Sequence, residues 1–109
     1  MSDFTAVLID DDPLVHAGWK FRAARTLKNI LTLASYTEFL EARERIPANV
    51  PIFIDANLGN GEHGELRARE IREMGYERVY LVTGYPEDSF PPMPWLTGIL
   101  GKSPPNWLF

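Results

Sequence analysis

A short apolar run, Pro51–Ile54, ends in the single carboxylate of Asp55 and passes into a glycine-containing loop, with Asn57 two residues further on. About four apolar residues in a row suit a strand that is buried on both faces of a parallel sheet. In an open α/β sheet, functional groups gather just beyond the carboxyl ends of the strands. The run therefore predicts a central strand with Asp55 at its functional end, although a lone Asp after a strand is more often a turn or helix-capping residue.

Four other apolar runs predict strands, and three of them also end near a polar group. The runs are Phe4–Ile9, Ile30–Ser35, Arg78–Val82 and Leu96–Leu100. Asp10, Thr83 and Lys102 come after the first, third and fourth of them. Because parallel strands end at one edge of a sheet, we expect these side chains and Asp55 to converge there.

The segment from Pro13 to about Leu27 has the periodicity of a helix. One stripe of residues runs through Leu14, and the next contains Val15, Trp19, Ala23 and Leu27. Asp12 before Pro13 is a favoured helix start, because the Asp side chain caps free N–H groups and Pro fits the first turn. We therefore assign Asp12 to capping, and we expect His16 to be a surface residue and Trp19 a core residue.

Two further helices and one long loop are expected. Ser35 opens a capping box with Glu38 for a helix that Pro47 ends. The third helix spans Glu65–Met74, followed by the stop signal of Gly75. Its residues available to face the core are Leu66, Ala68, Ile71 and Met74. The stretch 86–95 holds four prolines and predicts an irregular loop.

Composition narrows the class of protein. The 109 residues, 45% of them apolar, suit one domain spanning residues 1–109. A net charge of -4 without clustered Lys and Arg argues against nucleic-acid binding. The chain has no cysteine, no apolar run near the ~20 residues of a membrane span and no signal-peptide pattern, so we expect a cytoplasmic protein without a membrane segment.

Capping by Asp12 leaves Asp10 and Asp11 without a structural reason. Neighbouring carboxylates repel one another unless a cation binds them, and such hard oxygen ligands favour Mg²⁺, with Mn²⁺ as the alternative. Together with Lys102 and Thr83, the acidic cluster suits phosphoryl transfer to a carboxylate, with Asp55 as the acceptor. In that scheme Asp11 and Asp55 hold the metal, and Lys102 and Thr83 contact the remaining phosphoryl oxygens.

Four motifs in this order resemble those of response-regulator receiver domains. They are Leu8-Ile-Asp-Asp-Asp-Pro13, Ile54-Asp-Ala-Asn-Leu-Gly59, Val82-Thr-Gly84 and Gly101-Lys102. The likeness covers residues 4 to 104. It implies a flavodoxin-like α/β fold, a doubly wound sheet of five parallel strands in the order 2-1-3-4-5. It also implies a phosphoacceptor in two-component signalling, rather than an enzyme with its own substrate.

The resemblance assigns a role to each matching residue. Asp55 would accept the phosphoryl group, Asp11 would bind Mg²⁺ directly and Asp10 would bind it through water. Asn57 would offer its backbone carbonyl to the metal. Thr83 would be the switch hydroxyl and Lys102 would bind a phosphoryl oxygen. Ala56 and Tyr85 occupy positions that influence phosphoryl lifetime in the family. The implied partners are a histidine kinase or phosphotransfer protein and a downstream protein.

Several features depart from the family pattern. Ser103 stands where receivers usually have Pro after the Lys, so the cis peptide common there need not occur. Ile99 stands where an aromatic switch residue is usual. The proline-rich stretch replaces the fourth helix, and residues 103–109 leave no room for the fifth, so the fold should be truncated at its C-terminal helices.

Loss of these helices would expose apolar strand surface, which usually marks an interface. The sequence allows two ways of covering this surface. Four C-terminal residues could fold back as a lid, namely Trp95, Trp107, Leu108 and Phe109. Alternatively, a homodimer or another docked partner covers the surface.

Two rival functions also fit parts of the sequence. Asp10-Asp-Asp12 also fits the opening motif of haloacid-dehalogenase-like phosphatases, with Asp10 as nucleophile and Asp12 as acid/base. Those enzymes need another strand with acidic ligands after the Lys, and this interpretation leaves Asp55 without a role. The second rival is a degenerate receiver that acts as a binding or scaffold module without phosphorylation. The residues of the acceptor site are all present, so the sequence does not require this alternative. In the family, the fourth and fifth helices and the strand between them commonly carry the signal outward, and the loss of these helices makes the alternative credible.

Overall fold

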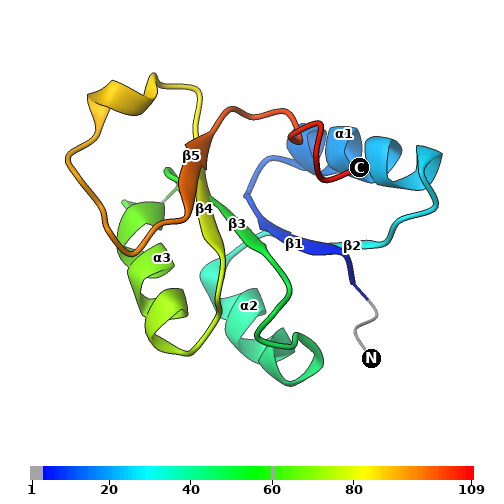
Figure 1. The fold of residues 1–109 in the computed structure, drawn as a ribbon, viewed down its shortest axis with the longest axis horizontal. Helices are drawn as coiled ribbons and strands as arrows, with labels where there is room; N and C mark the ends of the chain where they lie inside the picture. Colours follow the sequence, from blue (N-terminus) through cyan, green and yellow to red (C-terminus); the bar gives the residue numbers. More distant parts are fainter. Residues whose placement is uncertain (1–3, 60) are drawn as a thin grey trace.

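The structure is a computed structural model that describes residues 4–59 and 61–109. Within these residues, five parallel strands form one sheet in the order β2-β1-β3-β4-β5 (Figure 1). The strands are β1 Ala6–Ile9, β2 Ile30–Leu33, β3 Ile52–Asp55, β4 Val79–Val82 and β5 Gly98–Leu100. The predicted sheet and strand order are confirmed. The first, fourth and fifth strands begin one or two residues later than expected, and the second ends at Leu33 instead of Ser35.

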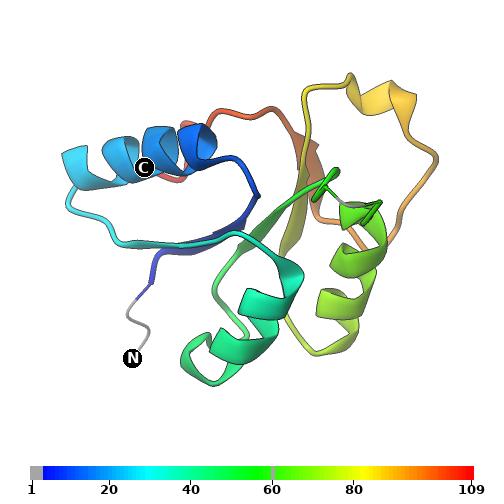
Figure 2. The same ribbon diagram turned by 180° about the vertical axis from the view of Figure 1, so that it is seen from behind.

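Helices cover both faces of the sheet. Helix α1 (Pro13–Arg25) lies on one face, and α2 (Tyr36–Ala42) and α3 (Gly64–Glu73) lie on the other (Figures 1 and 2). Two short 3₁₀ helices follow α2 and β4, namely η1 (Arg43–Arg45) and η2 (Glu87–Ser89). None of the helices described is long and apolar enough to cross a membrane.

The central strands are buried because both faces are covered. In β1, Val7 and Ile9 belong to the core cluster beside α2 and α3, while Ala6 and Leu8 belong to the cluster beside α1. All four residues of β1 have no exposed surface. The alternation explains why the run is apolar throughout, since successive side chains point to opposite faces of a strand.

Helix α1 begins as expected but ends earlier. The Asp12 side chain caps it by accepting a hydrogen bond from the Leu14 N–H at 2.9 Å. Trp19 and Ala23 are buried as predicted. The expectation that the helix continues to about Leu27 was wrong: the helix ends at Arg25, and Leu27 has a left-handed φ of 57° and is 95% exposed.

The capping box predicted for α2 is present. The Glu38 N–H donates to Ser35 Oγ at 3.1 Å, and Glu38 Oε1 accepts from the Ala34 N–H at 3.0 Å. Helix α3 begins at Gly64, and its predicted core residues Ala68 and Ile71 are buried. The expectation that Leu66 faces the core was wrong, because its side chain points outward and is 59% exposed.

The C-terminal segment, residues 103–109, covers the sheet beside α1. Leu108 is buried there, and Phe109 meets Trp19 edge-on with 6.5 Å between ring centroids. Trp107 lies over Tyr80 at 5.4 Å, although it is still partly exposed. Trp107, Leu108 and Phe109 therefore form the predicted lid on this face, where Figure 1 shows the end of the chain running beside α1. The inclusion of Trp95 in this lid was wrong, because Trp95 packs against the core cluster on the opposite face.

The proline-rich loop lies on the opposite face, between β4 and β5. Its Trp95 indole N–H donates to the Glu65 backbone carbonyl at 3.2 Å, and the Arg69 guanidinium lies 5.3 Å from the Trp95 ring. These contacts attach the loop to α3. The loop thus occupies the position for which a fourth helix would be expected, with η2 as its regular part.

Candidate functional site

The strand ends bring the predicted polar residues together. Asp10, Asp55 and Thr83 follow or end β1, β3 and β4, and all three are buried. Lys102, after β5, reaches the same place. With neighbouring loop residues they line a hollow of about 560 Å³ at the carboxyl edge of the sheet. The convergence expected from the sequence is therefore present.

Lys102 joins the two buried carboxylates. Its Nζ lies 2.7 Å from Asp55 Oδ1 and 3.1 Å from Asp10 Oδ2. Burial lowers the pKa of Lys102, but the hydrogen bonds and charges of Asp55 and Asp10 outweigh that effect, so its pKa is raised above the ordinary value. The ammonium group therefore stays charged at neutral pH and partly neutralises the cluster.

Asp55 is held by two donors on one oxygen. Besides Lys102, the Asn57 backbone N–H donates to Asp55 Oδ1 at 3.2 Å. Burial raises the pKa of Asp55, and the nearby charge of Asp10 raises it further, whereas Lys102 and the Asn57 N–H lower it. The net shift is upward. A further positive charge in this hollow would therefore favour the ionised carboxylate.

The backbone of Lys102 is held by Trp19, which the sequence predicted only as a core residue. The Trp19 indole N–H donates to the Lys102 carbonyl oxygen at 2.8 Å. Trp19 comes from α1, so this bond ties the helix to the loop after β5. The peptide that follows Lys102 is trans. No sequence motif predicts such a long-range hydrogen bond, because the sequence does not indicate which acceptor the indole N–H of a core Trp will meet.

The backbone around Asp10 is also held in place. Asp10 Oδ1 accepts the Asp12 N–H at 2.9 Å. His16 was expected at the surface, but it is half-buried and its Nε2 lies 2.5 Å from the Asp10 carbonyl oxygen. Both contacts fix the turn between β1 and α1. They leave Asp10 Oδ2 directed to Lys102.

The carboxylates fit a divalent cation. One oxygen from each of Asp10, Asp11 and Asp55 lies within 4.8 Å of the others. Hard anionic oxygens of this kind are the ligands that Mg²⁺ and Mn²⁺ favour. Gly59 leaves room for this arrangement, because a Cβ atom there would stand 2.9 Å from Asp11 Oδ2. Asn57 lines the same hollow.

Thr83 has a hydroxyl with one defined partner. Its Oγ1 accepts a hydrogen bond from the Tyr85 N–H at 3.1 Å. The hydroxyl proton therefore remains available for another acceptor. Ala56 and Tyr85 also line the hollow, and the Tyr85 side chain is exposed at its edge.

Two residues at the start of α3 were not assigned to the site from the sequence. Gly64 is required by close approach, since a Cβ atom there would stand 1.7 Å from the Asp55 carbonyl oxygen. Glu65 lines the hollow, and its Oε1 is buried without a hydrogen-bond partner in the described chain, 3.6 Å from His63 Nδ1. The only indication of this role in the sequence was the position of Gly64, directly before the predicted helix Glu65–Met74.

Comparison with known proteins supports the fold. No protein-family model and no curated protein sequence matches this chain. Among solved structures, it is similar to the receiver domain of the TMAO respiratory response regulator TorR, with 23% identity, coverage of 91% of this chain and 83% of that chain, and a TM-score of 0.69. The chain has the fold of response-regulator receiver domains.

Two more receiver structures agree with this result. A CheY-like receiver domain from Methylobacillus flagellatus is 19% identical, with coverage of 91% and 86% of the two chains and a TM-score of 0.71. The receiver domain of PhyR from Erythrobacter litoralis is 26% identical, with coverage of 91% and 78% and a TM-score of 0.63. The receiver fold thus extends over most of this chain.

Proposed function

We propose that this chain is a phosphoacceptor signalling domain of a two-component system. A phosphohistidine of a histidine kinase or phosphotransfer protein would donate the phosphoryl group, and Asp55 would accept it. The observation that carries the proposal is the contact of the Lys102 ammonium with both Asp10 and Asp55 inside an open hollow of a receiver fold. An ion pair placed there for stability alone would not need the surrounding hollow.

The transfer step follows from the geometry of Asp55. Its Oδ1 takes the hydrogen bonds from Lys102 and Asn57, which leaves Oδ2 as the nucleophile. Oδ2 forms a bond to phosphorus, the bond between phosphorus and the donor imidazole nitrogen breaks, and the imidazole leaves with the bonding electron pair. The product is a mixed anhydride of the Asp55 carboxyl group and phosphate.

Two side chains and a metal ion held by this chain would stabilise the transferring phosphoryl group. Lys102 would supply a positive charge, and the Thr83 hydroxyl would donate a hydrogen bond to a phosphoryl oxygen. Asp10, Asp11 and Asp55, together with the Asn57 carbonyl, would hold Mg²⁺, or Mn²⁺ in its place. A bound ion of this kind supplies charge neutralisation for the phosphoryl oxygens.

Asp12 argues against the phosphatase alternative. In that scheme it would be the general acid/base, but its side chain is used to cap α1 through the Leu14 N–H. Asp55, the residue without a role in that scheme, is the carboxylate that Lys102 contacts most closely. We therefore favour a phosphoacceptor over a turnover enzyme.

The proposal is tested by phosphorylation with a small-molecule donor. The protein is incubated with acetyl phosphate with and without Mg²⁺, and its intact mass is measured. We expect one Mg²⁺-dependent, base-labile phosphate, absent in Asp55→Asn and retained in the matched control Asp88→Asn, whose carboxylate is exposed outside the site. If no phosphate is added and beryllofluoride, a phosphoryl mimic, does not bind, the chain acts instead as a phosphorylation-independent scaffold.

The metal site is tested separately through stability. A ligand that binds only the folded state raises the free energy of unfolding by mass action. Saturating Mg²⁺ should therefore raise the melting temperature of the protein, and Asp11→Ala should reduce the increase. An unchanged melting curve in both proteins would contradict the metal site, whatever the result of the phosphorylation assay.

A further inference from the structure

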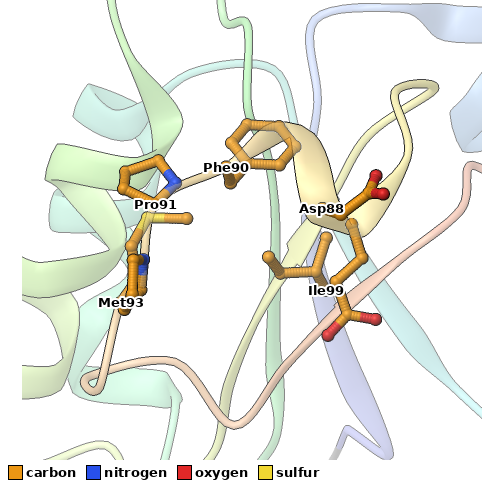
Figure 3. Close-up of a pocket in the computed structure, with 7 residues that line it drawn as sticks. Asp88, Phe90, Pro91, Met93 and Ile99 are labelled. Atoms are coloured by element: carbon orange, nitrogen blue, oxygen red, sulfur yellow. The ribbon is translucent and has the colours of Figure 1, made fainter.

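A second hollow, of about 610 Å³, lies between η2, the following proline-rich residues and β5. We call it the loop groove. Figure 3 shows Phe90, Met93 and Ile99 around its interior, with Pro91 on one side and Asp88 on the other. It is separate from the strand-end hollow that contains Asp55, and Phe90 lines both.

The interior of the loop groove is apolar and partly open to solvent. Phe90, Met93 and Ile99 pack against the core beside α3, but each retains exposed surface. Apolar side chains that line an open hollow are characteristic of binding sites rather than of an ordinary surface. The groove therefore offers space for an apolar side chain from outside the molecule.

The edge of the groove is acidic. Glu87 and Asp88 are both exposed, and neither forms an ion pair with any residue that the structure describes. Between Arg78 and Lys102 the sequence contains no Lys or Arg. The local charge is therefore negative, without a neighbouring cation on the loop to balance it. Such an edge is complementary to a positively charged ligand.

The groove is also held in shape before any ligand binds. The Ser89 N–H donates to the Pro86 carbonyl and the Phe90 N–H donates to the Glu87 carbonyl, which define η2. At the other end, Trp95 is attached to α3 through Glu65 and Arg69. Prolines between these ends restrict the backbone further. Less conformational entropy is then lost when a ligand binds.

From these observations we propose that the loop groove binds a segment of a partner protein in which apolar side chains are flanked by Lys or Arg. The apolar side chains enter between Phe90, Met93 and Ile99, and the cations pair with Glu87 and Asp88. This function goes beyond phosphoryl acceptance, and binding does not require a phosphoryl group on Asp55.

The test uses unphosphorylated protein and a fluorescent synthetic peptide in which two leucines are flanked on each side by lysines. We expect saturable binding, and NMR shift changes concentrated in residues 85–99. The double variant Glu87→Lys/Asp88→Lys and, separately, Met93→Asp should each weaken binding about tenfold, because charge pairing and apolar contact both contribute. Peptides with Glu in place of Lys, or Ser in place of Leu, should bind much more weakly.

A matched control separates the groove from general attraction to an acidic protein. Glu41→Lys/Glu44→Lys makes the same change of charge at exposed positions outside the groove. It should leave the affinity nearly unchanged. Equal losses in both double variants would overturn the proposal, as would shift changes outside the groove.

Two further outcomes would also overturn it. If the protein self-associates and the groove variants abolish this association, the groove binds a second copy of the chain rather than a foreign segment. If Met93→Asp unfolds the protein, Met93→Ser replaces it as the apolar-contact variant, and unchanged affinity in the folded variant rejects the groove as the binding site. Circular dichroism establishes which variants are folded.

Discussion

The two parts of this molecule cover the same sheet in different ways. Up to β4, its faces are covered by α1, α2 and α3, which satisfy their own backbone hydrogen bonds. After β4, the covering segments are irregular and use large apolar side chains, with Trp107, Leu108 and Phe109 on one face and Trp95 on the other. A sheet face therefore needs apolar area in the right place, and a helix is one of several ways to supply it.

The difference matters because the acceptor site draws on both parts. Asp10 and Asp55 come from the regular part, while Lys102 comes from the irregular part and is held by the Trp19 hydrogen bond. Variants in each part test whether the irregular segments contribute to folding as much as the helices do.

The largest effect is expected in the regular part, at Gly64. Gly64→Ala would place Cβ 1.7 Å from the Asp55 carbonyl oxygen, so the backbone must move. We expect the free energy of unfolding, measured with urea, to fall by about 3 kcal/mol. Gly18→Ala is the control: nothing lies within 4 Å of its Cβ, and Ala favours the helix by about 0.5–1 kcal/mol. A tolerated Gly64→Ala would contradict the close approach.

The next largest effect tests the irregular part. Leu108 is buried against the cluster beside α1, and Leu108→Ala should lower the free energy of unfolding by about 2–3 kcal/mol. The exposed neighbour Asn106, replaced by Ala, should change it by less than about 0.5 kcal/mol. Equal, small effects at both positions would mean that the C-terminal segment does not cover the sheet in solution.

The same contrast explains what the sequence could predict. The strands and the strand-end residues Asp55, Thr83 and Lys102 were identifiable, because buried parallel strands are continuous apolar runs and end at one edge. Capping by Asp12 and Ser35 was also local, and local hydrogen bonds can be inferred from neighbouring residue types.

The features that were missed have two origins. The bond between Trp19 and Lys102 and the outward direction of Leu66 depend on how distant segments meet. The left-handed Leu27 instead belongs to a local end of α1, where the Lys28 N–H donates to the Ala23 carbonyl. Periodicity assigns a face to each residue but does not show where a helix stops. The loop groove could not be predicted either, because prolines indicate irregular structure without specifying its shape.

A smaller effect on the free energy of unfolding is expected at the start of α2, in the regular part of the molecule. Ser35→Ala removes the side-chain acceptor for the Glu38 N–H and should cost about 1 kcal/mol of unfolding free energy. Thr37→Ala, at an exposed position of the same helix, should be neutral or slightly stabilising. A loss at Thr37 equal to that at Ser35 would show that the capping bond is not the cause.

The last effect is absent at neutral pH and appears only in alkali. Burial raises the pKa of Tyr36 from its ordinary 10.0 to about 12, with a further contribution from Glu70. The folded protein then keeps a proton that the unfolded chain loses, so stability should fall as pH rises from about 10 to 12. In Tyr36→Phe this slope should be smaller, with a remainder from Tyr76, whose pKa burial also raises. Urea unfolding across this pH range measures the difference.

The hydrogen bond from Trp19 to Lys102 also has an optical consequence. The indole is buried between Phe53 and Phe109, and its N–H donates to the residue whose ammonium contacts Asp55. Indole emission depends on the electrostatic field along the ring. Only Lys102 therefore lies between the Trp19 indole and the acceptor carboxylate of Asp55. With Trp95 and Trp107 replaced by Phe, Trp19 is the single tryptophan, and its emission should change when the charge at Asp55 changes.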